Sequence, residues 1–217
     1  MNGLSSRIAG MSAILFVVAM VVGVNLAFDS PDTDATDSEW TAWVKDGGNL
    51  VRNIIGGYTM VVAAILFIIF IVAMYQRFRA NDGDGGWATV MLATGLGWAS
   101  ALAIGAILIE TIPGTIKFGQ GPEPTAETAR WVTQTGFGVM LVAGGLCAGA
   151  AAAIMSALIL RTKALPAWLG YFGFLGAIGM FAAAFFLPMI IFGLWMLAMG
   201  VVLIMRSDSP AMAASKA

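Results

Sequence analysis

Histidine is absent from this 217-residue chain, and cysteine occurs once, as Cys147. Without histidine the chain lacks the residue that serves most often as general base, proton relay and metal or haem ligand. A single cysteine excludes an intramolecular disulfide and a cluster of thiolate ligands. No glycine-rich phosphate loop is present, and no lysine lies inside an apolar run. We therefore expect no metal, no cofactor and no enzyme activity.

Charged residues are also scarce, at 11% of the chain, whereas hydrophobic residues make up 59%. A soluble domain carries about 25% charged residues because its surface must be hydrated. The mean hydropathy is +0.89, and a chain of this length cannot hide five long uncharged runs from water. The net charge of −1 and the lack of a basic stripe exclude nucleic-acid binding. The sequence predicts one integral membrane domain over residues 1–217, with the lipid bilayer around it.

The longest uncharged run is Ala167–Met205. A membrane span needs roughly 20 apolar residues, so this run is long enough for two crossings. Pro188 lies near its middle, where proline removes a backbone donor and interrupts a helix. The run therefore predicts a helical hairpin with an apolar turn.

The complete pattern predicts an all-α polytopic transmembrane bundle of six spans. The expected spans are residues 8–28, 51–75, 87–109, 131–160, 167–187 and 188–205. A long connection is expected at Ile112–Arg130, and within it Thr125 is expected to cap a helix over Ala126–Arg130 that leads into the fourth span. Six crossings place both termini on one side of the membrane, and the basic residues indicate that this side is cytoplasmic. Seven basic residues fall on the side of the termini and four on the other, in what we expect to be a bacterial plasma (inner) membrane.

The first outer loop is acidic and ends in an amphipathic segment. Within Ser38–Val51, Trp40 and Trp43 share one helical face, which predicts a short helix lying on the outer membrane surface. Calcium binding by the preceding carboxylates is the alternative. An EF-hand loop requires a third acidic ligand and a glycine that the segment 32–37 lacks, so a solvated acidic loop is favoured.

Glu110 is the ionisable residue closest to the hydrocarbon, at the outer end of the third span. It can reach the interface or pair with Arg130 or Lys117. Alternatively it contacts a ligand or cation in an outward-facing cavity, with Arg52 and Asn53 at the same level. The ligand-binding candidates are therefore these two residues together with Glu110 and Arg130.

Small residues recur at helical spacing and predict close helix packing. They are Gly97, Ala101 and Gly105 on the third span, Gly145, Gly149 and Ala153 on the fourth, and Gly173 and Gly176 on the fifth. Small residues at such spacing let helix backbones approach closely. Packing within one bundle is favoured over a face between subunits.

The end of the chain resembles a known group of proteins. Residues 165–173 read Leu-Pro-Ala-Trp-Leu-Gly-Tyr-Phe-Gly, and Leu194–Gly200 precedes a basic residue, Arg206. Together with Arg7-Ile8-Ala9-Gly10 before the first span, this pattern is similar to the small bacterial multi-pass proteins of the DUF4386 family. The resemblance extends over the whole chain, but it implies no activity and no functional residue.

Three functions remain open at this stage. The leading hypothesis is a non-enzymatic, self-associating or accessory subunit, whose partners are copies of itself or other membrane subunits. The alternative is a channel or carrier for a small or lipid-like ligand that enters from the outer side near Glu110 and Arg52. A membrane-embedded enzyme acting on lipid is the third hypothesis.

Overall fold

Three helices are much longer than a bilayer requires. The computed structural model describes residues 3–32, 34–82, 85–119, 123–183 and 188–207. In it α3 (Gly47–Arg79) and α4 (Gly86–Phe118) have 33 residues each. The segments α5 (Ala126–Gly138), η1 (Val139–Gly144) and α6 (Gly145–Thr162) continue one another as a single helix of 37 residues. At 1.5 Å per residue these helices are about 50–55 Å long, whereas the hydrocarbon layer measures about 30 Å.

The remaining helices are shorter. They are α1 (Gly3–Ala27), α2 (Asp37–Lys45), α7 (Ala167–Phe181) and α8 (Met189–Ser207). By length and apolar composition, five helices in the described part of the chain can cross a membrane, and α7 with 15 residues is not among them. The expected fifth span, 167–187, is therefore too long: the helix ends at Phe181, and residues 184–187 of the expected turn lie outside the described residues.

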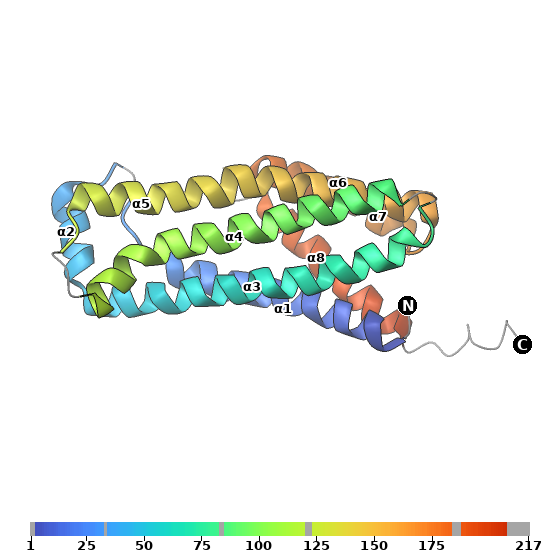
Figure 1. Cartoon of the computed structure of the whole chain (residues 1–217), viewed down its shortest axis with the longest axis horizontal. Helices are drawn as coiled ribbons and strands as arrows, with labels where there is room; N and C mark the ends of the chain where they lie inside the picture. The colour runs from blue at the N-terminus through green and yellow to red at the C-terminus, as the bar shows by residue number, and fades with distance from the viewer. Residues whose placement is uncertain (1–2, 33, 83–84, 120–122, 184–187, 208–217) are drawn as a thin grey trace, which may run out of the picture.

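Six helices form a closed ring around an apolar interior (Figure 1). In chain order α1, α3, α4, α6, α7 and α8 each pack on the next, and α8 packs on α1. α1 and α8 are antiparallel, since Gly10 lies against Gly200 while Val17 lies beside Gly193. The start of α1 and the end of α8 are thus at one end of the bundle, the terminal end. The opposite end, which carries α2, is the α2 end.

Large side chains fill the ring toward the terminal end. Phe70, Met74, Met155, Met196 and Met199 all have at most 1% of their surface exposed. Burial of such side chains contributes dispersion contacts that hold membrane helices together.

Basic residues close the terminal end through hydrogen bonds. Arg77 and Arg206 both donate to the carbonyl oxygen of Ala164, at 3.1 and 3.3 Å. Arg161 lies 3.4 Å from the carboxylate of Asp82, which is fully buried and also accepts from a backbone N–H at the start of α4. These contacts tie the α6–α7 connection and the α3–α4 connection to the bundle.

The α2 end is a small protein lobe and not a surface helix. Asp46 ends α2 and begins α3, where its side chain accepts from the N–H groups of Gly48 and Asn49. The single helix expected over Ser38–Val51 is therefore two helices. Trp40 and Trp43 are buried in a cluster with residues of α4 and α5, so their expected position at the lipid headgroups is wrong.

The lobe exists because α4 extends into the region predicted as a connection, and because α5 begins at Ala126 with Thr125 as its N-cap, as the sequence predicts. α4 continues through Pro113, which is buried inside the helix, and ends at Phe118. Proline removes one backbone hydrogen bond, but it does not end this helix. Ile112 of α4 and Ala129 of α5 then supply the apolar surface that covers the tryptophans of α2.

Candidate functional site: an apolar cavity between helices

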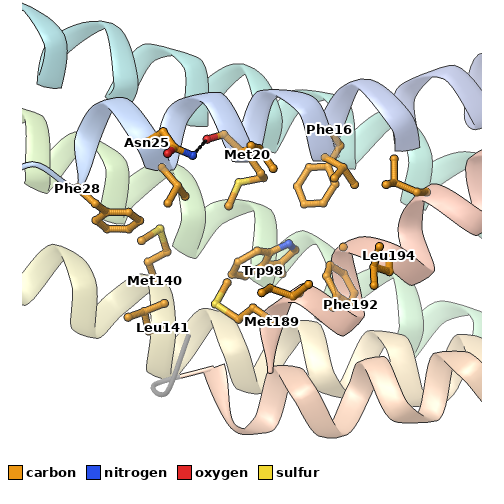
Figure 2. Close-up of a pocket in the computed structure, with 16 residues that line it drawn as sticks. Phe16, Met20, Asn25, Phe28, Trp98, Met140, Leu141, Met189, Phe192 and Leu194 are labelled. Carbon is orange, nitrogen blue, oxygen red and sulfur yellow. Dashed lines mark hydrogen bonds between the residues drawn. The ribbon is translucent and has the colours of Figure 1, made fainter. Parts of the chain in front are cut away.

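A cavity of about 580 Å³ lies between α1, α4, η1 and α8 and is open to the surface of the bundle, where Val21, Ile190 and Leu194 of its lining are more than half exposed (Figure 2). α1 lines it from Phe16 to Phe28, and α8 lines it from Met189 to Leu197. Trp98 of α4 lies between these two walls. Ligand pockets in proteins measure about 300–1,000 Å³, so the volume suits a small molecule or a single lipid chain.

The cavity follows from the unequal lengths of the helices. α1 packs on α3 and α8, whereas η1 packs on α4, α5 and α6. The short α7 and α8 do not extend to the α2 end, as α3, α4 and α5 do. The space between α1 and η1 is consequently left without a covering helix.

Trp98 owes its position to a glycine on the facing helix. A Cβ placed on Gly144 would lie 2.9 Å from both Cε3 and Cζ3 of the Trp98 ring. The benzene edge of the indole therefore packs on the bare backbone at Gly144. The nitrogen edge faces the other way, into the cavity between Phe16 and Met20 (Figure 2). Trp98 is only 1% exposed, and Nε1 has no hydrogen-bond partner among the described residues.

The wall opposite α1 contains the π-helical segment η1. Met140 and Leu141 of this segment line the cavity. π-helical turns are rare, widen the helix by one residue and occur frequently at functional sites. Here the widened turn faces the cavity, next to the glycine that accommodates Trp98.

Apart from the indole nitrogen of Trp98, the polar side-chain groups of the described residues at the cavity lie toward its α2 end. The Asn25 amide donates to the carbonyl oxygen of Val21 at 2.7 Å. Arg52 of α3 donates to the carbonyl oxygen of Asn25 at 3.1 Å and pairs with Asp29 at 2.9 Å. The cavity thus has an apolar body and one rim with an amide and an ion pair.

The four residues predicted to bind a ligand do not share one site. No hydrogen bond or ion pair joins any two of them within the described residues. Arg52 lies at the cavity rim as described above. Arg130 of α5 donates to the carbonyl oxygen of Ala35 and to the carboxylate of Asp37, both at 2.8 Å, and so holds the segment before α2.

Glu110 and Asn53 lie at the α3–α4 contact. Glu110 is half-buried, and its carboxylate lies against Gly57, where a Cβ would come within 2.6 Å of an oxygen. The expected pairing of Glu110 with Arg130 or Lys117 is absent from the described structure, because Arg130 binds the segment before α2. Asn53 is buried, with one long hydrogen bond of 3.5 Å to Asn49 and no partner for its side-chain oxygen in the described part of the chain.

The small residues predicted on the third span face other helices of the same chain. A Cβ on Gly105 would lie 2.8 Å from the carbonyl oxygen of Gly136, and the reverse distance is also 2.8 Å. Gly97 faces α6, and Ala101 lies buried against η1. These contacts hold α4 to the long helix that forms one wall of the cavity.

The small residues of the next two helices also lie inside the bundle. Gly145 and Gly149 face α7, where added Cβ atoms would meet backbone oxygens at 2.8 and 3.1 Å. Gly173 accommodates the ring of a tryptophan on α8, and Gly176 faces α8 at an ordinary contact distance. Ala153 is partly buried against the core.

The residues that line the cavity were not predicted from the sequence. One signal was available: Trp98 lies near the middle of an apolar run, whereas tryptophans of membrane proteins are enriched at the two interfaces. An indole N–H at that depth requires an acceptor. Among the described residues, no group of three or more His, Cys, Asp or Glu side chains is arranged to hold a metal ion.

The fold and its composition define a multi-pass α-helical membrane protein. Its long apolar helices, closed ring and scarcity of buried charge fit a lipid environment. The chain belongs to the family described as "Domain of unknown function (DUF4386)", whose model matches residues 8–205. No curated protein and no solved structure matches the chain.

Proposed function

We propose that this protein is a non-enzymatic membrane protein that binds a lipid-like ligand in the cavity between α1, α4, η1 and α8. The observation that carries the proposal is the cavity itself: a 580 Å³ space with an apolar lining that opens to the surface of a helical bundle of membrane character. This function corresponds to the carrier-type alternative of the sequence analysis, with the ligand taken up near Arg52.

The shape of the cavity favours a single long apolar chain. Its α1 wall extends from Phe16 to Phe28, which corresponds to about 18 Å at 1.5 Å per residue. An apolar chain along this wall would be in contact with aliphatic and aromatic side chains only. A polar head would then lie at the Asn25 rim, where Arg52 and Asp29 form an exposed ion pair.

We propose no enzyme activity for this cavity, and the chemistry of its lining agrees with that proposal. Among the described residues that line the cavity, none has an ionisable side chain. General acid–base catalysis requires a titratable group within hydrogen-bond reach of the substrate. A bound chain would have no such group beside it.

We further propose that the terminal end faces the cytoplasm of a bacterial cell. Arg77, Arg161 and Arg206 gather at this end, as the bias of basic residues toward the cytoplasm leads one to expect. The exposed aromatic residues include Tyr58, in the half of α3 nearer the α2 end, and Trp168, at the start of α7. Aromatic side chains of this kind anchor membrane proteins at the two interfaces. In this orientation the rim of the cavity faces the outer leaflet.

Self-association or an accessory role stays a prediction. The small residues from which it was drawn face helices of the same chain, so they give it no additional support. The mass of the detergent-solubilised protein tests this hypothesis independently of ligand binding.

The binding proposal is tested by photo-crosslinking a single-chain fatty-acyl probe that carries a diazirine in its chain. We expect the crosslinks to map to α1 and α8. Gly193 lines the cavity, and the nearest atom to an added Cβ is a Val17 methyl at 3.9 Å. Gly193→Leu should therefore fill part of the cavity and lower crosslinking.

Gly138→Leu provides the matched control, because an added Cβ there meets nothing within 4 Å. It should crosslink as the unmodified chain does. Equal crosslinking of both variants, or crosslinks that map outside α1, α4, η1 and α8, would overturn the proposal.

A further inference from the structure

The N–H group of Trp98 is a buried donor that faces the cavity without an acceptor. The side chain is 1% exposed, and Nε1 has no hydrogen-bond partner in the described part of the chain. Six other buried side-chain atoms among the described residues also lack partners, and two of them are the indole nitrogens of Trp40 and Trp43. None of the six belongs to a residue that lines the cavity. Leaving a buried donor unpaired destabilises a protein, so most such groups are paired with protein or with a bound molecule.

Another tryptophan that is buried to the same extent does have a hydrogen-bond partner for its indole N–H. Trp195 of α8 is also 1% exposed, and its Nε1–H donates to the carbonyl oxygen of Leu169 at 2.9 Å. Gly173 provides the room for that ring, since an added Cβ would lie 2.8 Å from its Cε2 and Nε1 atoms. Trp98 has an equivalent glycine under its benzene edge, Gly144, but its nitrogen faces the cavity and not a helix backbone.

We infer that the ligand of this cavity carries an uncharged acceptor oxygen that accepts a hydrogen bond from Trp98 Nε1, deep between α1 and α8. The inference rests on the proposed binding of a lipid-like ligand and adds the chemical class: an apolar molecule with a carbonyl group within its chain or ring.

The chemistry of the indole requires that the ligand contain a hydrogen-bond acceptor. The indole nitrogen donates and cannot accept, so its partner must be an acceptor. A hydrocarbon chain alone would leave the donor unpaired, and a carbonyl oxygen would pair with it.

The cavity also determines whether this acceptor group is charged or neutral. Its lining contains no cationic side chain, and Arg52 lies at the rim, bound to Asn25 and Asp29. A carboxylate or phosphate at the depth of Trp98 would be buried without a counter-ion, which is strongly unfavourable. The acceptor is therefore neutral.

The test uses a series of long-chain ketones that differ in the position of the carbonyl group. Each ketone is compared with the alkane of equal length. The full chain is labelled with ¹⁵N at its indole nitrogens and studied by NMR in detergent. Loss of one signal in Trp98→Phe assigns the Trp98 N–H, and the Trp195 signal serves as the internal control because its N–H is already bonded. We expect at least one ketone, but not the alkane, to move the Trp98 N–H proton downfield.

Affinities give a second readout that does not depend on the spectra. The best ketone should bind the unmodified chain about five- to tenfold more tightly than the alkane, as one additional net hydrogen bond predicts. Trp98→Phe should abolish this preference, so that ketone and alkane bind the variant with equal affinity.

The outcomes separate the two proposals. If alkane and ketones bind but no ketone moves the Trp98 signal or binds more tightly, the inference is overturned and the proposed function stands. If neither alkane nor ketone binds, the proposed function fails and the inference fails with it.

Discussion

The benzene edge of Trp98 lies on the bare Cα of Gly144, so close that a methyl group at position 144 would come within 2.9 Å of two ring carbons. This contact joins α4 to the π-helical segment and turns the indole nitrogen toward the cavity. A single missing Cβ thus affects both the packing of two helices and the orientation of a donor that lines the cavity without a partner among the described residues.

Gly144→Ala should destabilise the bundle and narrow the cavity, because the added methyl group must push the Trp98 ring away. Overpacking of this kind costs about 1–3 kcal/mol. The change is measured as a lower midpoint of thermal unfolding in detergent, together with weaker crosslinking of the acyl probe.

Gly138→Ala is the matched control on the same helix, where the added methyl group meets nothing within 4 Å. Its midpoint should not fall, since alanine favours a helix over glycine. Equal midpoints for the two variants would contradict the assigned contact.

Lys163→Gly should stabilise the protein. Lys163 ends α6 with a φ of 52°, a left-handed conformation that is unfavourable for a residue with a Cβ. Its backbone N–H bonds to the carbonyl oxygen of Ile159, a contact that glycine preserves. We expect a gain of up to about 1 kcal/mol, reduced by the greater freedom of glycine in the unfolded chain.

Lys163→Ala separates the backbone effect from the loss of charge. Alanine keeps a Cβ at the left-handed position, so it should give no such gain. A similar midpoint of thermal unfolding for both variants would argue against backbone strain at this position.

Acidification should loosen the start of α2. The backbone N–H of Thr36, followed by its hydroxyl, holds the pKa of the Glu39 carboxyl below its usual range. Because the folded-state pKa is the lower one, the stabilisation is present above the unfolded-state pKa and is lost as the pH falls through the folded-state pKa. Faster amide exchange in α2 between about pH 7 and pH 3, corrected for the intrinsic pH dependence of exchange, would show the effect.

Glu39→Gln is the control for this pH dependence. Glutamine can still accept the hydrogen bond of the Thr36 N–H but does not titrate. Its α2 should exchange at the same corrected rate across this range, and a pH dependence equal to that of the unmodified chain would assign the loosening to another group.

Arg130→Ala should release the segment before α2 from α5. The side chain joins the Ala35 carbonyl to the Asp37 carboxylate and is only partly exposed, so local opening should become easier by about 1–2 kcal/mol. Fluorescence quenching of Trp40 and Trp43 by a water-soluble quencher measures the opening.

Arg52→Ala provides a comparison with a more exposed ion pair, that of Arg52 with Asp29. It should leave quenching of the α2 tryptophans unchanged. Increased quenching in this variant alone would show that α2 is held from α3 and not from α5.

The proposed orientation is tested by labelling introduced cysteines in intact cells after Cys147 has been replaced by serine. With the terminal end in the cytoplasm, Ser38→Cys should react with a membrane-impermeant maleimide. Lys163→Cys should react only after permeabilisation, and the reverse pattern would overturn the orientation.

Hydrophobic runs predicted the class of protein and the centres of its membrane helices, because transfer of an uncharged helix into lipid depends on composition alone. The boundaries were harder to predict. Pro113 indicated a connection, yet α4 continues through it to Phe118, with the proline buried inside the helix. Likewise, the shared helical face of Trp40 and Trp43 predicts an apolar surface, but the sequence does not show whether lipid or protein covers it. In the structure, residues of α4 and α5 cover it.

Sequence by itself therefore determined that this protein is a multi-pass helical membrane protein with little buried charge. Only the tertiary structure decided that the cavity exists, that Trp98 faces it, and that Glu110 lies apart from Arg130. The physical reason is that an empty volume belongs to no single segment. It depends on how far α8 extends beside α1 and on which side chain meets Gly144 across a gap of 46 positions in the chain.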